Sequence, residues 1–123
     1  SYGLTYTTFS YSAPRIDRKK ISKTETVQVS VDITNTGKKT GEEVVQLYIS
    51  DKVSTGIRPV KELKDFARIS LSPGETKTVK FTVTPDKLEY YNLNLEKVIE
   101  PGEFEVLVGP NSEDLKGVSF EVI

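Results

Sequence analysis

Apolar and polar residues alternate along most of this chain, in short runs separated by turn-forming residues. Between Val27 and Ile33 every second residue is a branched aliphatic one, and the residues between them are polar. A period of two places the aliphatic side chains on one face of a strand. Such runs recur at regular spacing, and no helical period extends over more than about two turns. The sequence therefore predicts an all-β fold, an antiparallel immunoglobulin-like β-sandwich of about seven strands.

Turn signals divide the runs. Pro73-Gly74 and Pro101-Gly102 fit the two central positions of type II turns. In Asn35-Thr36-Gly37 we expect a turn in which Gly37 can take a positive φ. Residues 85–88 are expected to form a turn or a single helical turn. The strands predicted after the first are Val44–Ser50, Lys64–Leu71, Val79–Val83, Phe104–Val108 and Val118–Val122.

The first 24 residues differ from the rest. Residues 2–11 are aromatic and rich in Thr, and they are expected to form an edge strand or an extended arm. Residues 12–24 are rich in charge and are typical of a connector. We therefore divide the chain into a leader arm and connector at 1–24 and a sandwich at 25–123. Because the chain has no Met, we expect it to be a processed or cloned piece of something longer.

Composition excludes several function classes. The net charge of -1 argues against a basic nucleic-acid module and against a polybasic membrane anchor. No apolar run is long enough to span a bilayer. The chain has neither Cys nor His, which removes thiolate chemistry, the commonest general base and His-based metal sites. We expect no cofactor and no metal, and the composition leaves the compartment open.

Two strands differ from the others in their outward residues. The strand at Val44 turns Val44 and Tyr48 outward, and the strand at Phe104 turns Leu107 outward. In a sandwich of this type these strands would be neighbours, which predicts a sheet with a mixed apolar outer face. The segment 58–66, RPVKELKDF, fits strand periodicity poorly at its start. Leu63 shares a parity with Ala67, Ile69 and Leu71, which predicts that Leu63 points inward and Phe66 outward.

Five segments in order resemble a known family. They are YGLTYTTF at 2–9, VSVDITNTGKKTGEEVVQLYIS at 29–50, RPVKELKDF at 58–66, LSPGET at 71–76 and EPGEFEVLVG at 100–109. Nearly the whole chain resembles the fibronectin type III-like C-terminal domain of glycoside hydrolase family 3, the β-glucosidase and β-xylosidase group. Asp65 stands where that family usually has Gly, and Ser1 where its leader usually has Gly.

The resemblance implies a parent enzyme that hydrolyses β-glycosides with retention, using catalytic residues on other domains. It also implies that the leader at 1–24 arrives from a preceding domain. No catalytic residue carries over, so this chain is expected to be a non-catalytic structural module that packs against the catalytic domains. For Arg58 two alternatives stay open: a bidentate pair with a carboxylate of a neighbouring domain, with Pro59 holding the loop extended, or a solvated loop residue. The residues expected to dock between domains are Tyr2, Leu4, Tyr6, Tyr48, Arg58, Pro59, Phe66 and Leu107.

A few residues allow a more specific functional interpretation. Glu103 and Glu105 face the same way, as a glycosidase carboxylate pair would, but a solvated strand face explains them better. Tyr90 and Tyr91 are weak candidates for a sugar-binding platform, against one Tyr packed at a sandwich corner and the other half exposed. The alternative function is a free-standing carbohydrate-binding or cell-surface adhesion module. In some members of the family such a domain supports dimer contacts, so the resemblance adds homodimer contacts as an alternative.

Overall fold

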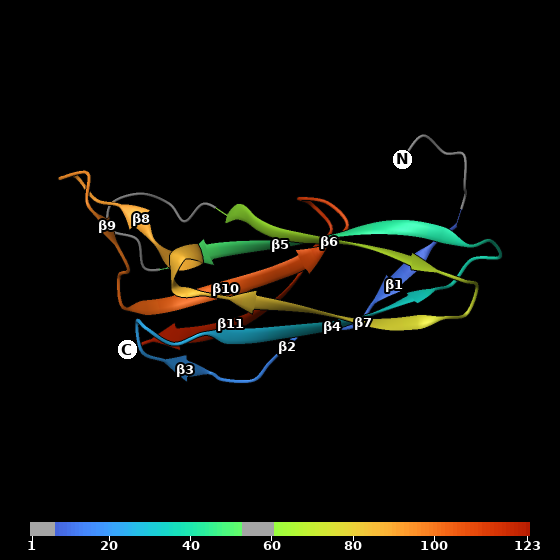
Figure 1. The fold of residues 1–123 in the computed structure, drawn as a ribbon, viewed down its shortest axis with the longest axis horizontal. Coiled ribbons are helices and arrows are strands. Elements are labelled where there is room, and N and C mark those ends of the chain that lie inside the picture. The colour runs from blue at the N-terminus through green and yellow to red at the C-terminus, as the bar shows by residue number, and fades with distance from the viewer. Residues whose placement is uncertain (1–6, 53–60) are drawn as a thin grey trace.

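The computed structural model describes residues 7–52 and 61–123 of the chain as a β-sandwich (Figure 1). In the first sheet β4 is the central strand. Strands β1 and β2 pair with different parts of one edge of β4, and β7 pairs with its other edge. All of its pairings are antiparallel. Its strands are β1 (Phe9–Tyr11), β2 (Arg15–Ile16), β4 (Val27–Asn35) and β7 (Thr76–Val83).

The second sheet has five strands in the order β3-β11-β10-β5-β6. Only the pairing of β11 with β3 is parallel among its described strands. As predicted, the strand that contains Val44 and the strand that contains Phe104 are neighbours. The strands of this sheet are β3 (Lys20–Ile21), β5 (Gly41–Asp51), β6 (Lys61–Leu71), β10 (Gly102–Gly109) and β11 (Lys116–Val122).

The core lies between the two sheets and follows the predicted parity. On β4 the aliphatic residues from Val27 to Ile33 are completely buried, as are Val45 and Leu47 on the facing sheet. Phe104 and Phe120 stack with ring centroids 5.7 Å apart. Alternation buries one face of each strand against the other sheet, which is the main source of stability in a sandwich.

Two small elements cap one end of the sandwich. The segment Pro85–Leu88 forms a 3-10 helix, η1, as expected from sequence, with Leu88 buried. After it, β8 (Tyr90–Tyr91) and β9 (Lys97–Val98) form a separate two-stranded hairpin. Figure 1 shows this hairpin projecting from one end, while the β4–β5 and β6–β7 turns lie at the other. No helix in the described ranges is long and apolar enough to cross a membrane.

The expected leader and connector contribute strands to both sheets. Residues 9–11 pair with β4, and residues 15–16 pair with the same strand further along. Residues 20–21 pair with β11 in the second sheet, where Ile21 is buried in the core. The chain therefore passes from the first sheet to the second before β4 begins.

The predicted turns differ in their details. At Pro73-Gly74 the type II turn is confirmed, because Gly74 has φ 79° and the Glu75 amide donates to the Ser72 carbonyl. Gly102 has φ 140°, outside the range of that turn, and already belongs to β10. The expectation of a positive φ at Gly37 is wrong. Glycine is needed there for space, since a Cβ would collide with Oγ1 of Thr7.

Candidate docking surface

The outer face of the second sheet carries an apolar strip, made of Tyr48 on β5, Leu107 on β10, and Leu63 and Phe66 on β6. Tyr48 lies directly opposite Leu107 on one side and opposite Leu63 on the other. Phe66 lies opposite Gln46, two residues from Tyr48 on the same face of β5. Side chains opposite each other on one face are in contact range, so the strip is contiguous across three strands.

Leu63 reaches this strip through a β-bulge. Leu47 pairs with Asp65 and the next residue, Tyr48, pairs with Leu63, so Lys64 is an extra residue in β6. The inserted residue reverses the alternation before it. The prediction that Leu63 points inward with Ala67 is therefore wrong, and its side chain is 51% exposed. The prediction that Phe66 points outward is confirmed, with 60% of the side chain exposed.

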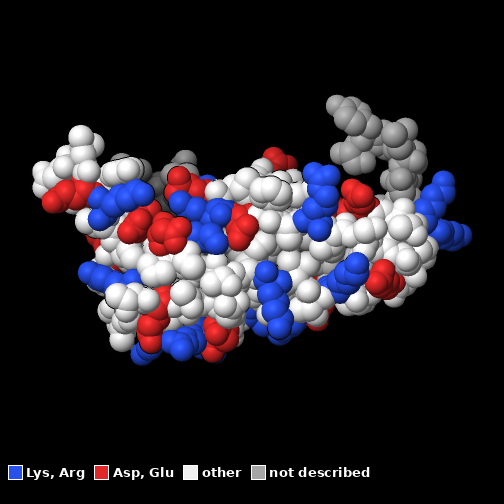
Figure 2. All heavy atoms as spheres, in the orientation of Figure 1, with Lys and Arg blue, Asp and Glu red and all other residues white. Residues whose placement is uncertain are grey.

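The strip has polar groups and ion pairs around it. The Tyr48 hydroxyl donates to Oε1 of Gln46 at 2.6 Å, so its polar end is satisfied within the sheet. Lys52 pairs with Glu105 at 3.2 Å, and Lys64 pairs with Glu62 at 3.5 Å. In the view of Figure 2 acidic and basic side chains are interspersed without a large field of one sign. An apolar centre with a charged rim is the usual anatomy of a protein–protein contact.

Asp65, the departure from the family pattern, makes its contacts within the domain. Its Oδ2 pairs with the Lys87 ammonium of η1 at 3.2 Å, and its Oδ1 accepts from the Phe66 amide at 2.8 Å. Lys87 also donates to the Thr82 carbonyl of β7 at 2.8 Å. Asp65 thus ties β6 to η1, and its carboxylate takes part in the sandwich and not in the apolar strip.

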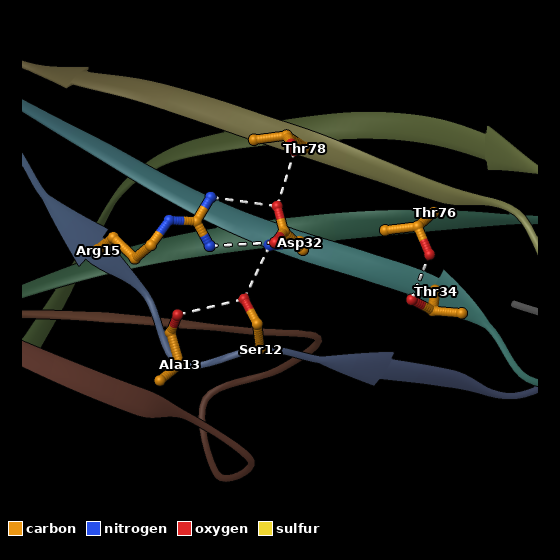
Figure 3. Close-up of polar contacts among 7 residues, drawn as sticks. All are labelled: Ser12, Ala13, Arg15, Asp32, Thr34, Thr76 and Thr78. Atoms are coloured by element: carbon orange, nitrogen blue, oxygen red, sulfur yellow. Dashed lines mark hydrogen bonds and ion pairs between the residues drawn. The ribbon is translucent and has the colours of Figure 1, made fainter.

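The outer face of the first sheet is polar and satisfied by its own contacts (Figure 3). Asp32 on β4 accepts two hydrogen bonds from Arg15 of β2, at 3.1 and 3.2 Å, and one from Thr78 of β7 at 2.7 Å. These bonds, those from Arg15 first, lower the pKa of the Asp32 carboxyl. Nearby, the hydroxyls of Thr34 and Thr76 are 2.6 Å apart. A face of this kind offers little to an apolar partner.

Asn35 joins the leader to the sandwich at one end. Its side chain is fully buried, and Oδ1 accepts from the Thr7 hydroxyl at 2.7 Å and from the Gly37 amide at 2.9 Å. Its Nδ2 donates to the carbonyls of Lys39 and Leu71 at 2.8 and 2.9 Å. All four hydrogen-bonding positions of the amide are used. Sequence reasoning missed this role, although a polar residue on the buried parity of β4 was a signal for it.

A second set of contacts holds the end of β1. The Tyr11 hydroxyl donates to Oε2 of Glu43 at 3.0 Å, and the Lys116 ammonium donates to the Tyr11 carbonyl at 2.6 Å. Partial burial raises the pKa of the Glu43 carboxyl. Burial also raises the pKa of Tyr11 above its usual value, and the Glu43 charge adds to this effect. Since Glu43 lies on β5 and Lys116 on β11, β1 is held to both sheets.

The other sequence candidates have ordinary surroundings. Glu105 is paired with Lys52, and Glu103 is exposed opposite Glu121. Within the described ranges His, Cys, Asp and Glu form no group of three that could hold a metal. Tyr90 is half-buried, while Tyr91 is 64% exposed with the Lys97 ammonium 5.8 Å from its ring centroid. Five of the expected docking residues lie outside the described ranges, namely Tyr2, Leu4, Tyr6, Arg58 and Pro59.

Comparison with known proteins gives consistent matches. Residues 43–112 match the model of the fibronectin type III-like domain. A β-xylosidase from Formosa agariphila is 50% identical over 98% of this chain, which covers 17% of that relative. A β-glucosidase from Bacteroides ovatus is 44% identical over 99% of this chain and is covered to 17%. The chain thus spans about one sixth of the curated relatives that it matches.

Solved structures agree with these matches. A β-glucosidase from Erythrobacter marinus superposes with a TM-score of 0.91 at 37% identity, over 99% of this chain and 16% of that one. A mutant β-glucosidase from Listeria innocua, solved in complex with laminaribiose, gives a TM-score of 0.89 at 40% identity, over 99% of this chain and 17% of that one. The likeness therefore extends over the whole described sandwich and over a small part of each relative.

Proposed function

Because this chain belongs to the fibronectin type III-like domain family, we propose that it serves as a non-catalytic accessory module of a family 3 glycoside hydrolase of the β-glucosidase type. The apolar strip on the second sheet is the observation that carries the proposal. It is the surface that packs against the catalytic domains of the same polypeptide. The sugar-hydrolysing chemistry belongs to those domains.

The energetics of the strip support a docking role. Covering Leu63 and Phe66 removes two half-exposed apolar residues from water, each contributing roughly half of the 1.5–3 kcal/mol that burial of a fully exposed side chain gives. A patch of this size is small for a free complex, which usually buries about 800 Å² on each partner. A covalently linked domain meets it at an effective concentration of the order of millimolar, so a modest contact is sufficient.

The leader supports the same proposal. We infer that residues 1–24 lead in from a preceding domain and that residues 25–123 form the module. Strands β1, β2 and β3 of the leader and connector join the two sheets of this module. Asn35 and Glu43 hold the end of the leader at Thr7 and Tyr11, so the direction in which the chain enters the sandwich is fixed. We propose that Tyr2, Leu4, Tyr6, Arg58 and Pro59 also contact the neighbouring domain.

The test uses the full-length polypeptide that carries this chain. Replacing Leu63 and Phe66 by Ser is expected to lower its thermal midpoint, because the docked face loses its apolar contacts. The matched control is Lys80→Ser on β7, an exposed residue of the polar sheet, which should leave the midpoint unchanged. A double variant L63S/F66S with the midpoint of the parent would contradict the proposal.

A second measurement addresses chemistry. The 123-residue chain alone is expected to release no product from an aryl β-glucoside, since Glu105 is engaged with Lys52 and Glu103 is exposed to solvent. Turnover that is lost on replacing Glu103 or Glu105 by Gln would show that the module itself is an enzyme.

A further inference from the structure

The tip of the β8–β9 hairpin holds a second group of exposed apolar side chains, Tyr91, Leu93 and Leu95. Leu93 is fully exposed and Leu95 is 81% exposed. Among the described residues, these three make up half of the exposed large hydrophobic side chains, and they lie within five positions. In Figure 2 the projection at the place of β8 and β9 is largely uncharged.

The tip has a defined shape. Oδ1 of Asn92 accepts from the amides of Asn94 and Glu96, at 2.9 and 3.0 Å. In the backbone, the N–H of Asn92 donates to the Glu96 carbonyl, and the N–H of Leu95 donates to the Asn92 carbonyl, both at 3.0 Å. Side-chain caps of this kind fix a turn in one conformation. Leu93 and Leu95 are therefore held in solvent by a structured loop.

The backbone at the tip is strained at one residue. Leu95 has φ 61°, and it is the only residue other than Gly with a positive φ in the described ranges. A residue with a Cβ pays roughly 1–2 kcal/mol in this region, a cost that Gly avoids and that Asn offsets in part through a local hydrogen bond. Leu at this position therefore adds backbone strain as well as the cost of its exposure to water. A positive φ is usual at the last position of a three-residue hairpin loop, but Gly normally occupies it. Strained residues kept in a structure cluster at functional segments.

We propose that this tip docks into an apolar recess on a second folded domain of the same polypeptide, as a contact separate from the apolar strip. The inference rests on the proposed function, because the proposed function supplies the neighbouring domain that the tip would contact. The matched relatives are about six times as long as this chain, so most of such a polypeptide lies outside it. Asn92, Asn94, Glu96 and Lys97 would form the polar rim around the apolar side chains.

The size of the tip favours a linked domain over a free partner or a second copy. A stable complex between separate molecules usually needs about 20–30 residues on each side, and the tip supplies only a few. Three apolar anchors are sufficient when the partner is covalently attached, because the contact then forms at an effective concentration of the order of millimolar. The ordered loop lowers the entropy that docking would otherwise cost.

The experiment measures thiol labelling in the full-length polypeptide, with peptides resolved by mass spectrometry. Three single variants are compared: Leu93→Cys at the tip, Phe66→Cys in the strip and Thr82→Cys on the exposed polar sheet as the control. The expected result is labelling at position 93 at least tenfold slower than at position 82, and independent of protein concentration. The variant L93S/L95S should also lower the thermal midpoint.

The outcomes separate the two proposals. Slow labelling at 66 with a rate at 93 equal to that at 82 would overturn the tip contact and leave the strip proposal standing. Equal rates at all three positions would overturn both. Slow labelling at 93 that disappears on dilution would show a second copy as the occupant, and that too would overturn the inference.

Discussion

The hydroxyl of Thr7 donates a 2.7 Å hydrogen bond to the side-chain oxygen of Asn35, which lies 28 residues further along the chain. Through its other bonds the same amide reaches the carbonyls of Lys39 and Leu71. One buried side chain therefore connects the leader, the β4–β5 turn and the end of β6. This connection is formed within the sandwich and needs no partner domain.

Asn35→Ala is expected to be one of the most damaging single changes in the domain. It leaves the buried Leu71 carbonyl and the half-buried Gly37 amide without these bonds, and an orphaned buried group costs about 1–3 kcal/mol. We expect a loss of about 3 kcal/mol in the free energy of unfolding, measured by urea titration with circular dichroism. Asn94→Ala, at an exposed position, is the control and should change it by less than about 0.5 kcal/mol. Equal effects of the two changes would refute the role given to Asn35.

Gly37→Ala tests the close approach of the leader. The added Cβ would collide with Oγ1 of Thr7 and lie 3.0 Å from the Thr8 amide nitrogen. Overpacking of this kind costs about 1–3 kcal/mol. Because the nearest obstacle is the Thr7 hydroxyl, the double variant T7A/G37A should lose less stability than the sum of the two single variants. Strict additivity in urea titrations would mean that the two residues are not in contact.

The stability of the domain should depend on pH through the carboxyl group of Glu43. Since the pKa of its carboxyl is raised by partial burial, the folded state binds the proton more tightly than the unfolded state does. The contribution of Glu43 to stability then decreases as pH rises from the ordinary value of 4.5 through the raised pKa. Glu43→Gln should therefore gain stability relative to the parent at pH 7 and lose that gain at about pH 3. Thermal midpoints measured across this range check it, and a gain that persists unchanged at acid pH would contradict it.

Through Asp32, the stability of the domain should depend on pH in the opposite direction. Its pKa is lowered, chiefly by hydrogen bonds from Arg15, so its contribution is present above the ordinary value of 3.8 and is lost as pH falls through the lowered pKa. Asp32→Asn should be less stable than the parent near neutral pH, and the difference should shrink under acid conditions. The same series of thermal midpoints measures it. A difference that grows on acidification would exclude the pairing with Arg15 as its source.

The alternation of residues predicted the core and the neighbouring strands well. Val27 to Ile33 are buried as expected, and Tyr48 faces Leu107 on the outer surface. The pattern failed at Lys64, because one inserted residue in an edge strand reverses the parity of Leu63 and leaves no mark in composition.

The alternation of residues also could not predict the shortest strands. The two-residue strands at Arg15–Ile16 and Lys20–Ile21 contain too few residues to display a period. Their pairing depends on contacts with β4 and β11, which come later in the chain. At Gly37 the sequence signal for glycine was correct, but its cause was a contact with Thr7 and not a backbone angle.

The bulge at Lys64 also affects the tendency of the molecule to aggregate through the edge of its second sheet. Strand β6 is the edge of the second sheet, and a long regular edge can recruit the same strand of another molecule. The extra residue interrupts the row of backbone donors and acceptors on an eleven-residue strand, and the charges of Lys61, Glu62 and Arg68 oppose stacking in register. Deleting Lys64 would turn Leu63 inward and leave an uninterrupted edge, so one inserted residue separates an exposed apolar strip from an aggregation template.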